Sequence, residues 1–543
     1  METFDSKNLQ NLDKQTLITM LELSLASNNA LKKNVEDLNK RIDLLTEQMI
    51  LANSQRFGRK SEKDLTDEAD GQMRFVFNEA EGTYDIVCNL KEPEASEVIH
   101  PKAYRRVKKK KGKREADLAD IVTTVVEHTI TEEKLEEAFP DGKWKRLPDE
   151  VYKRLEFHPA TFEVIEHHVA VYAGKGEKTV IKADRPTDMF RNSIATPSLV
   201  AGILNYKYVN AMPISRLAAE FERQDVKISS QNMCHWAIKS SDMYLSRLYK
   251  RMHMYMSDYH VIHADETPLK VNRDGRPTGS KSYMWVYRTG GLEEHPIVLY
   301  EYQKTRKTDH PREFLRDFRG YCVTDGYQVY HTIDNERPDL KVAGCWVHAR
   351  RGFAELIKAT GKTASKGTTA YKAAALIDEM FSKEKTYKGL SSGERLNKRQ
   401  EEVAPLVDAF FAYIKKEAQN VAPKSKLGKS ITYCLNQEKY LRVFLEDGLV
   451  PMDNNAAERS IRPFCLGKKN WNVIDTVSGA RASAVLYSIA ETAKANNLKP
   501  YEYFRYLLEE IPKHGEFEED NYLDSLLPWS PDLPEECRKQ TDE

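Results

Sequence analysis

The sequence lacks the paired cysteines that mark disulfide-rich or zinc-binding chains. It contains 7 cysteines, which are scattered along the chain, and no two of them form a Cys-x-x-Cys pair. The odd number and the wide spacing are typical of a reduced intracellular protein rather than of a secreted disulfide framework.

Long hydrophobic runs are also missing. No apolar stretch approaches the ~18 residues of a membrane-spanning helix, and the polar start METFDSKNLQ predicts no signal peptide. Because 40% of the 543 residues are hydrophobic, the chain can build sizeable cores and is not a disordered protein. These features predict a cytoplasmic protein without a membrane partner, built from several domains.

The chain has no net charge, since 83 basic residues balance 83 acidic ones, but the charges are segregated. Residues 101–114 (PKAYRRVKKKKGKR) contain nine Lys or Arg and no acid, whereas the tail from Gly515 is acidic. Such a basic run is usually a solvated linker, but it is also the electrostatic signature of nucleic-acid binding. The candidate DNA contacts in it are Arg105, Arg106, Lys108 and Lys109.

Apolar residues near the N-terminus repeat at alternating steps of four and three. The repeat comprises Leu31, Val35, Leu38, Ile42, Leu45 and Met49. This is the a/d seam of a coiled coil, in which the polar Asn28 would fix the pairing. A helix packed within its own chain would show the same repeat. Because the flanking sequence is highly polar, we favour a leucine zipper over residues 1–55 that forms a homo-oligomer.

The middle of the chain reads as three further regions. We predict a basic linker at 56–115 and a small α+β domain at 116–187, in which EVYKRLEFHPATFEVIEHHVAVYAG alternates like two strands around His158. Residues 188–255 are predicted to be helical. Two helices there, 214–224 and 230–241, have the spacing of a helix-turn-helix, which many ordinary helical hairpins share.

From residue 256 onward the pattern changes to strands. Three strand-like runs come first: YHVIHADETPLKV, SYMWVYRTG and HPIVLYEYQ. A short helix (PREFLRDF), a buried strand (GYCVTDGYQVY) and a strand running into a helix (VAGCWVHARR) follow them. This order indicates a ribonuclease H-like α/β fold over residues 256–485. Residues 352–450 are helical and charged, so we predict a helical insertion within that domain.

Three acids follow these elements. Asp265 is expected to end the first strand and Asp325 the fourth, while Glu458 opens a short helical turn before Pro463. Each acid alone fits an ordinary turn or a solvated helix face. Together they would converge, and three close carboxylates cannot all stay ionised without a cation. Carboxylate oxygens suit Mg²⁺, or Mn²⁺ as an alternative, and a pair of such ions catalyses phosphodiester chemistry.

Other side chains near these acids are candidates for supporting roles. Four basic residues would contact DNA phosphates: Arg459, Arg462, Lys468 and Lys469. Cys345 and His348 have zinc-like spacing, but no second pair of ligands lies near them in the sequence. We therefore expect Cys345 and His348 to support the active site at a helix entry and expect no zinc.

Several motifs resemble those of a known family. RFGRKSEK, ADETPLKV, TDGYQVY, GCWVHARR and DNNAAERSIRPFCLGKKNW resemble the motifs of the IS-sixty-six (IS66) family of bacterial insertion-sequence transposases, of the TnpC type. The resemblance covers nearly the whole chain. It implies a DDE transposase with Asp265, Asp325 and Glu458 as the triad, an N-terminal leucine zipper, a helical insertion, and a small C-terminal domain at 486–543.

The chain departs from the family in one respect. The family usually carries a cysteine-rich zinc finger, but no cysteine lies between Cys88 and Cys234. His158, His167 and His168 do not replace the missing ligands. Residues 116–187 are therefore interpreted as a degenerate, metal-free version of that domain.

The sequence thus predicts a transposase that cleaves the ends of a mobile element and joins the 3′-OH to target DNA. Its partners would be element ends, target DNA and accessory proteins encoded by the same element, in the bacterial nucleoid. Two alternatives are a catalytically inactive DNA-binding relic and a structure-specific nuclease with the same fold. A strand-joining assay distinguishes them, because a nuclease cleaves without joining and a relic does neither.

The seam generates a test of self-association. Replacing Leu38 and Leu45 with Lys places charges in the apolar seam, so an oligomer should become a monomer. Light scattering of the purified protein measures the mass. An unchanged mass in the double variant would mean that the helix packs within its own chain.

Overall fold

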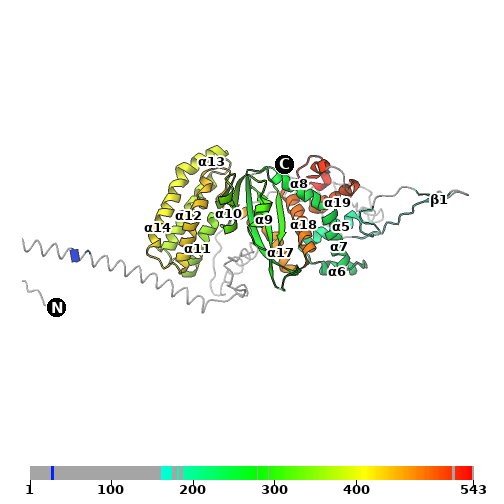
Figure 1. Ribbon diagram of the computed structural model, residues 1–543, viewed down its shortest axis with the longest axis horizontal. Helices are drawn as coiled ribbons and strands as arrows, with labels where there is room; N and C mark the ends of the chain where they lie inside the picture. Colours follow the sequence, from blue (N-terminus) through cyan, green and yellow to red (C-terminus); the bar gives the residue numbers. More distant parts are fainter. Residues whose placement is uncertain are drawn as a thin grey trace, which may run out of the picture.

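The computed structural model (Figure 1) describes residues 26, 27, 29, 161–173, 180–182, 188–191, 193–277, 279–291, 293–361, 363–515 and 520–540. The predicted leucine seam at 31–49 and the basic run at 101–114 lie outside these residues. Among the helices of the described ranges, none is both long enough and apolar enough to cross a membrane.

A mixed sheet lies at the centre of the molecule, in the order β5-β4-β3-β6-β7. Its strands are β3 (Val261–Arg273), β4 (Lys281–Thr289), β5 (Val298–Gln303), β6 (Gly320–Thr324) and β7 (Leu340–Gly344). The pairs β3–β4 and β4–β5 are antiparallel, whereas β3–β6 and β6–β7 are parallel. The short β8 (Ile474–Thr476) pairs with the far end of β3. The predicted α/β class is therefore confirmed.

The prediction that Asp265 ends the first strand is wrong, because β3 continues to Arg273. Only the start of β3, up to His263, is paired with β6, while β4 stays paired with β3 as far as Lys270. The β3–β4 hairpin therefore runs on past the end of β6. Pro268, which has no backbone N–H, lies in this extension, where β3 has left β6 and a proline costs no ladder hydrogen bond on that side.

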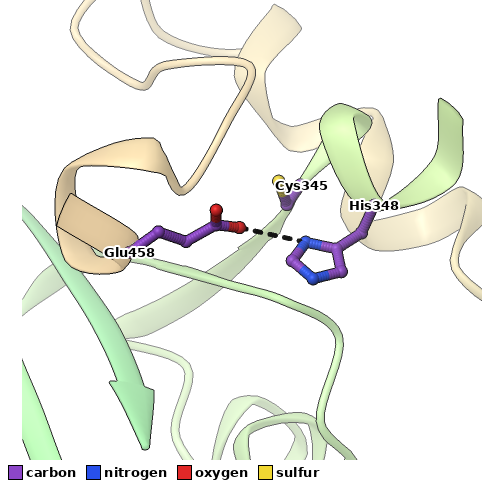
Figure 2. A group of neighbouring side chains, drawn as sticks. All are labelled: Cys345, His348 and Glu458. Carbon is purple, nitrogen blue, oxygen red and sulfur yellow. Dashed lines mark ion pairs between the residues drawn. The ribbon is translucent and has the colours of Figure 1, made fainter. Parts of the chain in front are cut away.

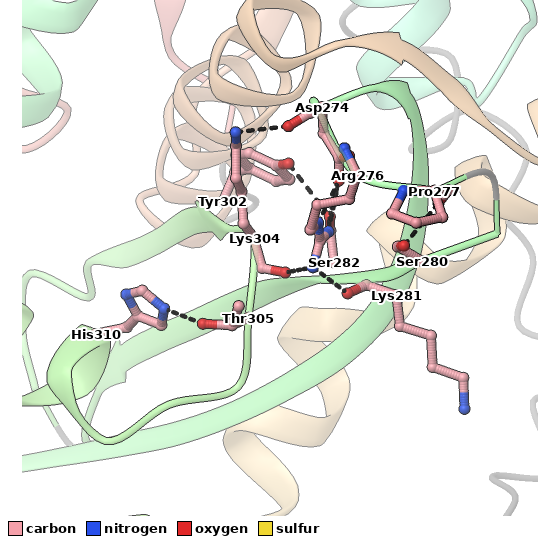
Figure 3. Close-up of polar contacts among 10 residues, drawn as sticks. All are labelled: Asp274, Arg276, Pro277, Ser280, Lys281, Ser282, Tyr302, Lys304, Thr305 and His310. Atoms are coloured by element: carbon pink, nitrogen blue, oxygen red, sulfur yellow. Dashed lines mark hydrogen bonds and ion pairs between the residues drawn. The ribbon is translucent and has the colours of Figure 1, made fainter.

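A polar network fixes the tip of this hairpin (Figure 3). The Arg276 guanidinium donates to the buried carboxylate of Asp274 and to the carbonyl of Lys304, and Lys304 Nζ donates to the Asp274 carbonyl at 2.6 Å. Ser282 Oγ also donates to Asp274 at 3.2 Å. These bonds tie the hairpin tip to the end of β5, so the long hairpin is held at its free end.

Helices cover both faces of the sheet. On one face, Tyr287 of β4 stacks on Phe314 of α9 (Asp309–Phe314) with ring centroids 3.6 Å apart, and Trp285 contacts Tyr330 of α10 (Gln328–Glu336). On the other face, Arg288 donates to Ser460 Oγ of α17 (Asn455–Trp471) at 3.2 Å. Successive β4 residues thus point to opposite helical layers.

The edge strand β5 is completed by α18 (Val477–Ala495). Thr492 Oγ1 accepts a hydrogen bond from the Val298 N–H at 3.0 Å and is also placed to donate to the Val298 carbonyl at 2.9 Å. Ser488 Oγ accepts from the Tyr300 N–H at 2.8 Å. Hydroxyls of a helix therefore satisfy backbone groups that an edge strand would otherwise leave unpaired.

The segment between β7 and α17 is a bundle of helices to one side of the sheet (Figure 1). Its members are α11 (Trp346–Thr360), α12 (Thr369–Thr386), α13 (Ser392–Lys398), α14 (Ala404–Ala418), α15 (Lys426–Asn436) and α16 (Glu438–Leu441). This bundle has its own core, which also includes Val261, Val323 and Ala343 of the sheet. The insertion therefore packs directly on β3, β6 and β7.

The remaining helices lie on the other side of the sheet. They are α5 (Pro197–Leu204), α6 (Ile214–Glu222), α7 (Ser230–Ser240), α8 (Ser246–Met256) and α19 (Pro500–Glu510). Residues from these helices, from α17 and α18, and from the sheet share one core. The predicted boundaries at 255 and 485 therefore do not separate independent cores, and the second of them falls inside α18. The physical reason is that α18 packs closely on β5, which joins the predicted C-terminal domain to the core of the sheet.

The predicted strand in residues 161–170 is wrong, because these residues have no regular secondary structure. The side chains of Val164 and Ile165 are 95% and 67% exposed, so no burial of apolar surface stabilises a strand there. The end of the same predicted stretch is a strand, β1 (Val171–Ala173), which pairs antiparallel with β2 (Val180–Lys182).

The edge of β5 provides a test of the fold. Thr492→Val keeps the side-chain shape but leaves two buried backbone groups of Val298 without their partner, so stability should fall by about 1–3 kcal/mol. Urea unfolding measures the loss. The control, Ser246→Ala, removes an exposed hydroxyl of α8 and should change stability by less than about 0.5 kcal/mol. Equal effects of the two substitutions would mean that β5 does not depend on α18.

Candidate active site

Asp265 occupies a buried position in β3. One carboxylate oxygen, Oδ1, accepts a hydrogen bond from the Glu266 N–H at 2.8 Å, while Oδ2 is buried without a hydrogen-bond partner among the described residues. Burial, together with the nearby charges of Glu266, Asp325 and Glu458, raises the pKa of Asp265 well above its usual value. These acids therefore share one electrostatic environment.

Asp325 follows β6 and begins a turn. Its Oδ1 accepts a hydrogen bond from the Tyr327 N–H at 3.1 Å, across Gly326, whose φ of +92° lies in the left-handed region that favours glycine. The negative charge of Asp325 contributes to raising the pKa of both Asp265 and Glu458. The turn thus brings the second acid near enough to the first and third for its charge to act on both.

Glu458 lies in the first turn of α17 and is only 6% exposed. The residue that caps this helix, Asn454, ties it to β3. Asn454 Oδ1 accepts a hydrogen bond from His263 Nδ1 at 3.0 Å, and Asn454 Nδ2 donates to the Ala264 carbonyl at 2.9 Å. Both bonds are made beside Asp265, so the start of α17 is fixed against the strand that carries the first acid.

The predicted short turn ending at Pro463 is wrong, because α17 continues to Trp471. A proline removes one helical hydrogen bond and usually bends or breaks a helix. Here Ala457, Ile461 and Phe464 are buried in the core of the sheet. The burial of this face offsets the loss, which sequence reading alone does not reveal.

Cys345 and His348 lie beside Glu458 (Figure 2). Ligand atoms of the three side chains are within 4.8 Å of one another, and His348 Nδ1 is 3.6 Å from Glu458 Oε1. Burial lowers the pKa of His348 to about 4 and raises the pKa of the Cys345 thiol to about 12. The three side chains offer one sulfur, one nitrogen and one carboxylate, which is one ligand fewer than the four of a structural zinc site.

Glu458 also faces a cation. Arg351 of α11 has a nitrogen 3.8 Å from Glu458 Oε1. Burial raises the pKa of Glu458, while the charges of Arg351 and Arg462 oppose that rise. Like Asp265 Oδ2, Glu458 Oε1 is buried without a hydrogen-bond partner in the described part of the chain.

The donor set fits a hard divalent cation. The charges of Asp325 and Glu458 raise the pKa of Asp265, so the three carboxylates lie near one another, although only Cys345, His348 and Glu458 have ligand atoms within 4.8 Å of one another among the described residues. Asp265 and Glu458 each keep a buried oxygen without a hydrogen bond. Their mutual repulsion is the kind of energy that a cation offsets, and carboxylate oxygens are the ligands that Mg²⁺ prefers. Asp265, Asp325 and Glu458 are therefore the residues that would hold it.

The candidate DNA contacts on α17 differ in their surroundings. Arg459 and Lys469 are exposed and Arg462 is half-buried. Lys468 Nζ, in contrast, donates to Thr267 Oγ1 at 3.1 Å and to the Pro268 carbonyl at 2.7 Å, and burial lowers its pKa. Lys468 thus fastens α17 to β3, and this placement argues against its predicted role at a phosphate. The other four candidates, Arg105, Arg106, Lys108 and Lys109, lie outside the described residues.

Sequence reasoning missed several residues at the site, among them Glu266 and Asn454. Glu266 pairs in register with Trp285, so its side chain points to the sheet face opposite Asp265, where it forms an ion pair with Arg306. Burial raises the pKa of Glu266 to about 7 even with this partner. If the first strand had been predicted to continue past Asp265, the alternation of side chains along a strand would have placed Glu266 on the face opposite Asp265. The bonds of Asn454 to distant residues leave no signal in sequence spacing.

In comparisons with known proteins, models of one family match most of the chain. A family model described as "Transposase IS66 family" matches residues 192–482, which include all three acids, and the "IS66 C-terminal element" matches residues 488–529. A model described as "Transposase C of IS166 homeodomain" matches residues 44–121.

Two curated relatives come from Sinorhizobium fredii. The chain is 27% identical to uncharacterized protein y4qI, over 92% of this chain and 91% of that protein. It is 28% identical to uncharacterized protein y4jD, over 72% of this chain and 76% of that protein. The similarity to y4qI therefore extends over nearly the full length of both chains.

The crowded carboxylates generate a stability test. Asp265→Asn removes a buried charge, so the metal-free variant should melt above wild type at pH 8. The folded-state pKa of Asp265 is raised, so ionisation weakens the fold. This penalty is complete above the folded-state pKa and disappears as the pH falls toward the unfolded-state pKa. The gain from Asp265→Asn should therefore shrink at acid pH.

Scanning calorimetry in EDTA and in Mg²⁺ measures these effects. Mg²⁺ should raise the melting temperature of wild type more than that of Asp265→Asn, because the variant has lost a ligand. Glu355→Gln, an exposed change on α11, is the matched control. A variant that melts below wild type in EDTA would contradict the electrostatic argument.

Proposed function

Because the chain belongs to the IS66 family of transposases, we propose that it cleaves the ends of a mobile DNA element and joins the freed 3′-OH to target DNA. Asp265, Asp325 and Glu458 are the proposed catalytic triad. The observation that carries the proposal is the convergence of these three acids, from separate elements, in one largely buried site. A solvated helix face, the alternative for Glu458, does not agree with its 6% exposure.

The catalytic core is proposed to be ribonuclease H-like. The chain order β3, β4, β5, α9, β6, α10, β7 follows the sequence of elements expected for that fold. The sheet order β5-β4-β3-β6-β7, with three antiparallel strands and then two parallel ones, supports the same assignment. This arrangement places Asp265 on the central strand and Asp325 at the end of its parallel neighbour.

The three carboxylates are proposed to hold Mg²⁺, with Mn²⁺ as an alternative. When bound, a pair of such cations activates the attacking oxygen and stabilises the leaving oxygen of a phosphodiester. The protein's own part is to hold the acids in place. Asn454 fixes the start of α17 against β3, and the neutral ring of His348, together with Arg351, lies against Glu458. Because His348 stays neutral, it does not add a positive charge that would compete with a cation.

DNA is proposed to lie along the exposed side of α17. Arg459 and Lys469 are exposed there and Arg462 is half-buried, so all three can reach phosphate oxygens next to Glu458. The basic run at 101–114 is a further proposed contact. Binding carried by such contacts weakens as salt concentration rises, because counterions are released from the DNA.

Further parts of the proposal concern assembly. We propose homo-oligomerisation through the N-terminal seam and cooperation with accessory proteins encoded by the same element. The helices α6 and α7, joined by residues 223–229, are a candidate DNA-reading helix-turn-helix. The retention of all three acids in one site favours an active enzyme over a DNA-binding relic.

The triad is tested by separating chemistry from binding. Glu458→Gln removes a charge while keeping the side-chain shape, so cleavage and joining should fall by roughly a thousandfold. DNA affinity should stay near the wild-type value, because the phosphate contacts remain. Strand-transfer and gel-shift assays on element-end DNA measure the two properties, with Glu355→Gln as the control.

A complementary substitution removes a DNA contact. Arg462→Ala should weaken DNA binding and lower its salt dependence while leaving Mg²⁺ affinity near the wild-type value. Cleavage by Glu458→Gln near the wild-type rate would overturn the assignment of the triad. Cleavage by wild type without any strand joining would favour the nuclease alternative.

A further inference from the structure

The helical insertion reaches the turn that carries Asp325. Tyr433, on α15 of the insertion, donates a hydrogen bond from its hydroxyl to the backbone carbonyl of Asp325 at 2.8 Å. Gln437, just beyond the end of α15, lies against the next residue, with Nε2 at 3.4 Å from the Gly326 carbonyl. Two consecutive peptide units at the active site are thus held by side chains from the insertion.

The fit between α15 and this turn leaves no spare room. A Cβ atom added to Gly326 would lie 3.0 Å from Tyr433 Oη and 3.0 Å from Gln437 Cδ. Gly326 also has a φ of +92°, which side-chain-bearing residues rarely adopt. The turn after β6 can therefore take this shape only with a glycine, and the insertion packs tightly against it.

The part of the insertion that makes these contacts is itself anchored to the core. Within the insertion, Trp346 Nε1 donates to the Leu441 carbonyl at 2.8 Å. The ring of Tyr440 stacks on His331 of α10, outside the insertion, with centroids 3.7 Å apart. Lys439 forms an ion pair with Asp334 at 2.5 Å. The contacts of Tyr440 and Lys439 hold α16 against α10, the helix that follows the turn of Asp325, and α16 comes directly after the helix that carries Tyr433.

We propose that Tyr433 is a positioning residue for Asp325, so that the helical insertion is a working part of the catalytic centre. The proposal rests on the function proposed above. The backbone conformation of the turn sets the direction of the Asp325 side chain. Tyr433 fixes that conformation by its hydrogen bond to the Asp325 carbonyl. Loss of a hydrogen bond that orients a metal ligand typically lowers metal affinity by about 10- to 100-fold.

The test uses Tyr433→Phe in the full-length protein, with Mn²⁺ as the probe. The variant removes one hydroxyl and keeps the ring, so α15 should stay packed. Its Mn²⁺ affinity, followed by electron paramagnetic resonance of the free ion, is expected to fall about tenfold. Cleavage of supercoiled plasmid DNA should recover when Mn²⁺ is raised to saturation, which loss of folding would not allow. Tyr413→Phe, on α14 of the same insertion, is the matched control and should bind like wild type.

Two further variants keep the result interpretable. Gln437→Leu removes the second donor to the turn and should also weaken Mn²⁺ binding. Asp325→Asn removes a proposed ligand and should weaken Mn²⁺ binding most of the three variants. Wild-type affinity in both Tyr433→Phe and Gln437→Leu, with Asp325→Asn impaired, would overturn the positioning role alone. Wild-type affinity in Asp325→Asn would instead overturn the metal site and the proposed function with it.

Discussion

Burying several carboxylates in one site is the constraint on which the rest of this structure depends. Like charges repel strongly where water is scarce, and burial penalises each ionised acid further. The ion pair with Arg306 offsets only Glu266, whose side chain lies on the sheet face away from Asp265. Arg351 and Arg462 offset part of the charge of Glu458. The fold has to resist the remaining repulsion among Asp265, Asp325 and Glu458 by other contacts.

Those contacts are made mainly through the backbone. Asn454 donates to the Ala264 carbonyl, Tyr433 donates to the Asp325 carbonyl, and the Trp346 N–H donates to the Met452 carbonyl. Each bond fixes a segment that carries or precedes an acid without using a carboxylate oxygen. Asp265 Oδ2 and Glu458 Oε1 therefore keep no hydrogen bond within the described residues.

The sequence predicted those features that depend on short motifs and on local patterns of apolar residues. The family resemblance, which the family match confirms, and the α/β class follow from motifs and from strand-like runs around Asp265 and Asp325. It was misleading where distant packing decides. Asp265 and Pro463 are predicted to end their elements, yet β3 and α17 continue past them, because pairing with β4 holds the strand and burial in the core of the sheet holds the helix. The contact between Tyr433 and Asp325 joins residues far apart in the chain and leaves no local pattern.

The hydroxyls of Ser488 and Thr492 have a consequence for how copies of this protein can meet. An unpaired edge strand is a template on which another chain can add its own strand, and proteins avoid this by covering such edges. At β5 the place of the next strand is taken by a helix whose side chains already occupy the backbone groups. Strand addition by a second copy is therefore blocked at Val298 and Tyr300 on that side of the sheet.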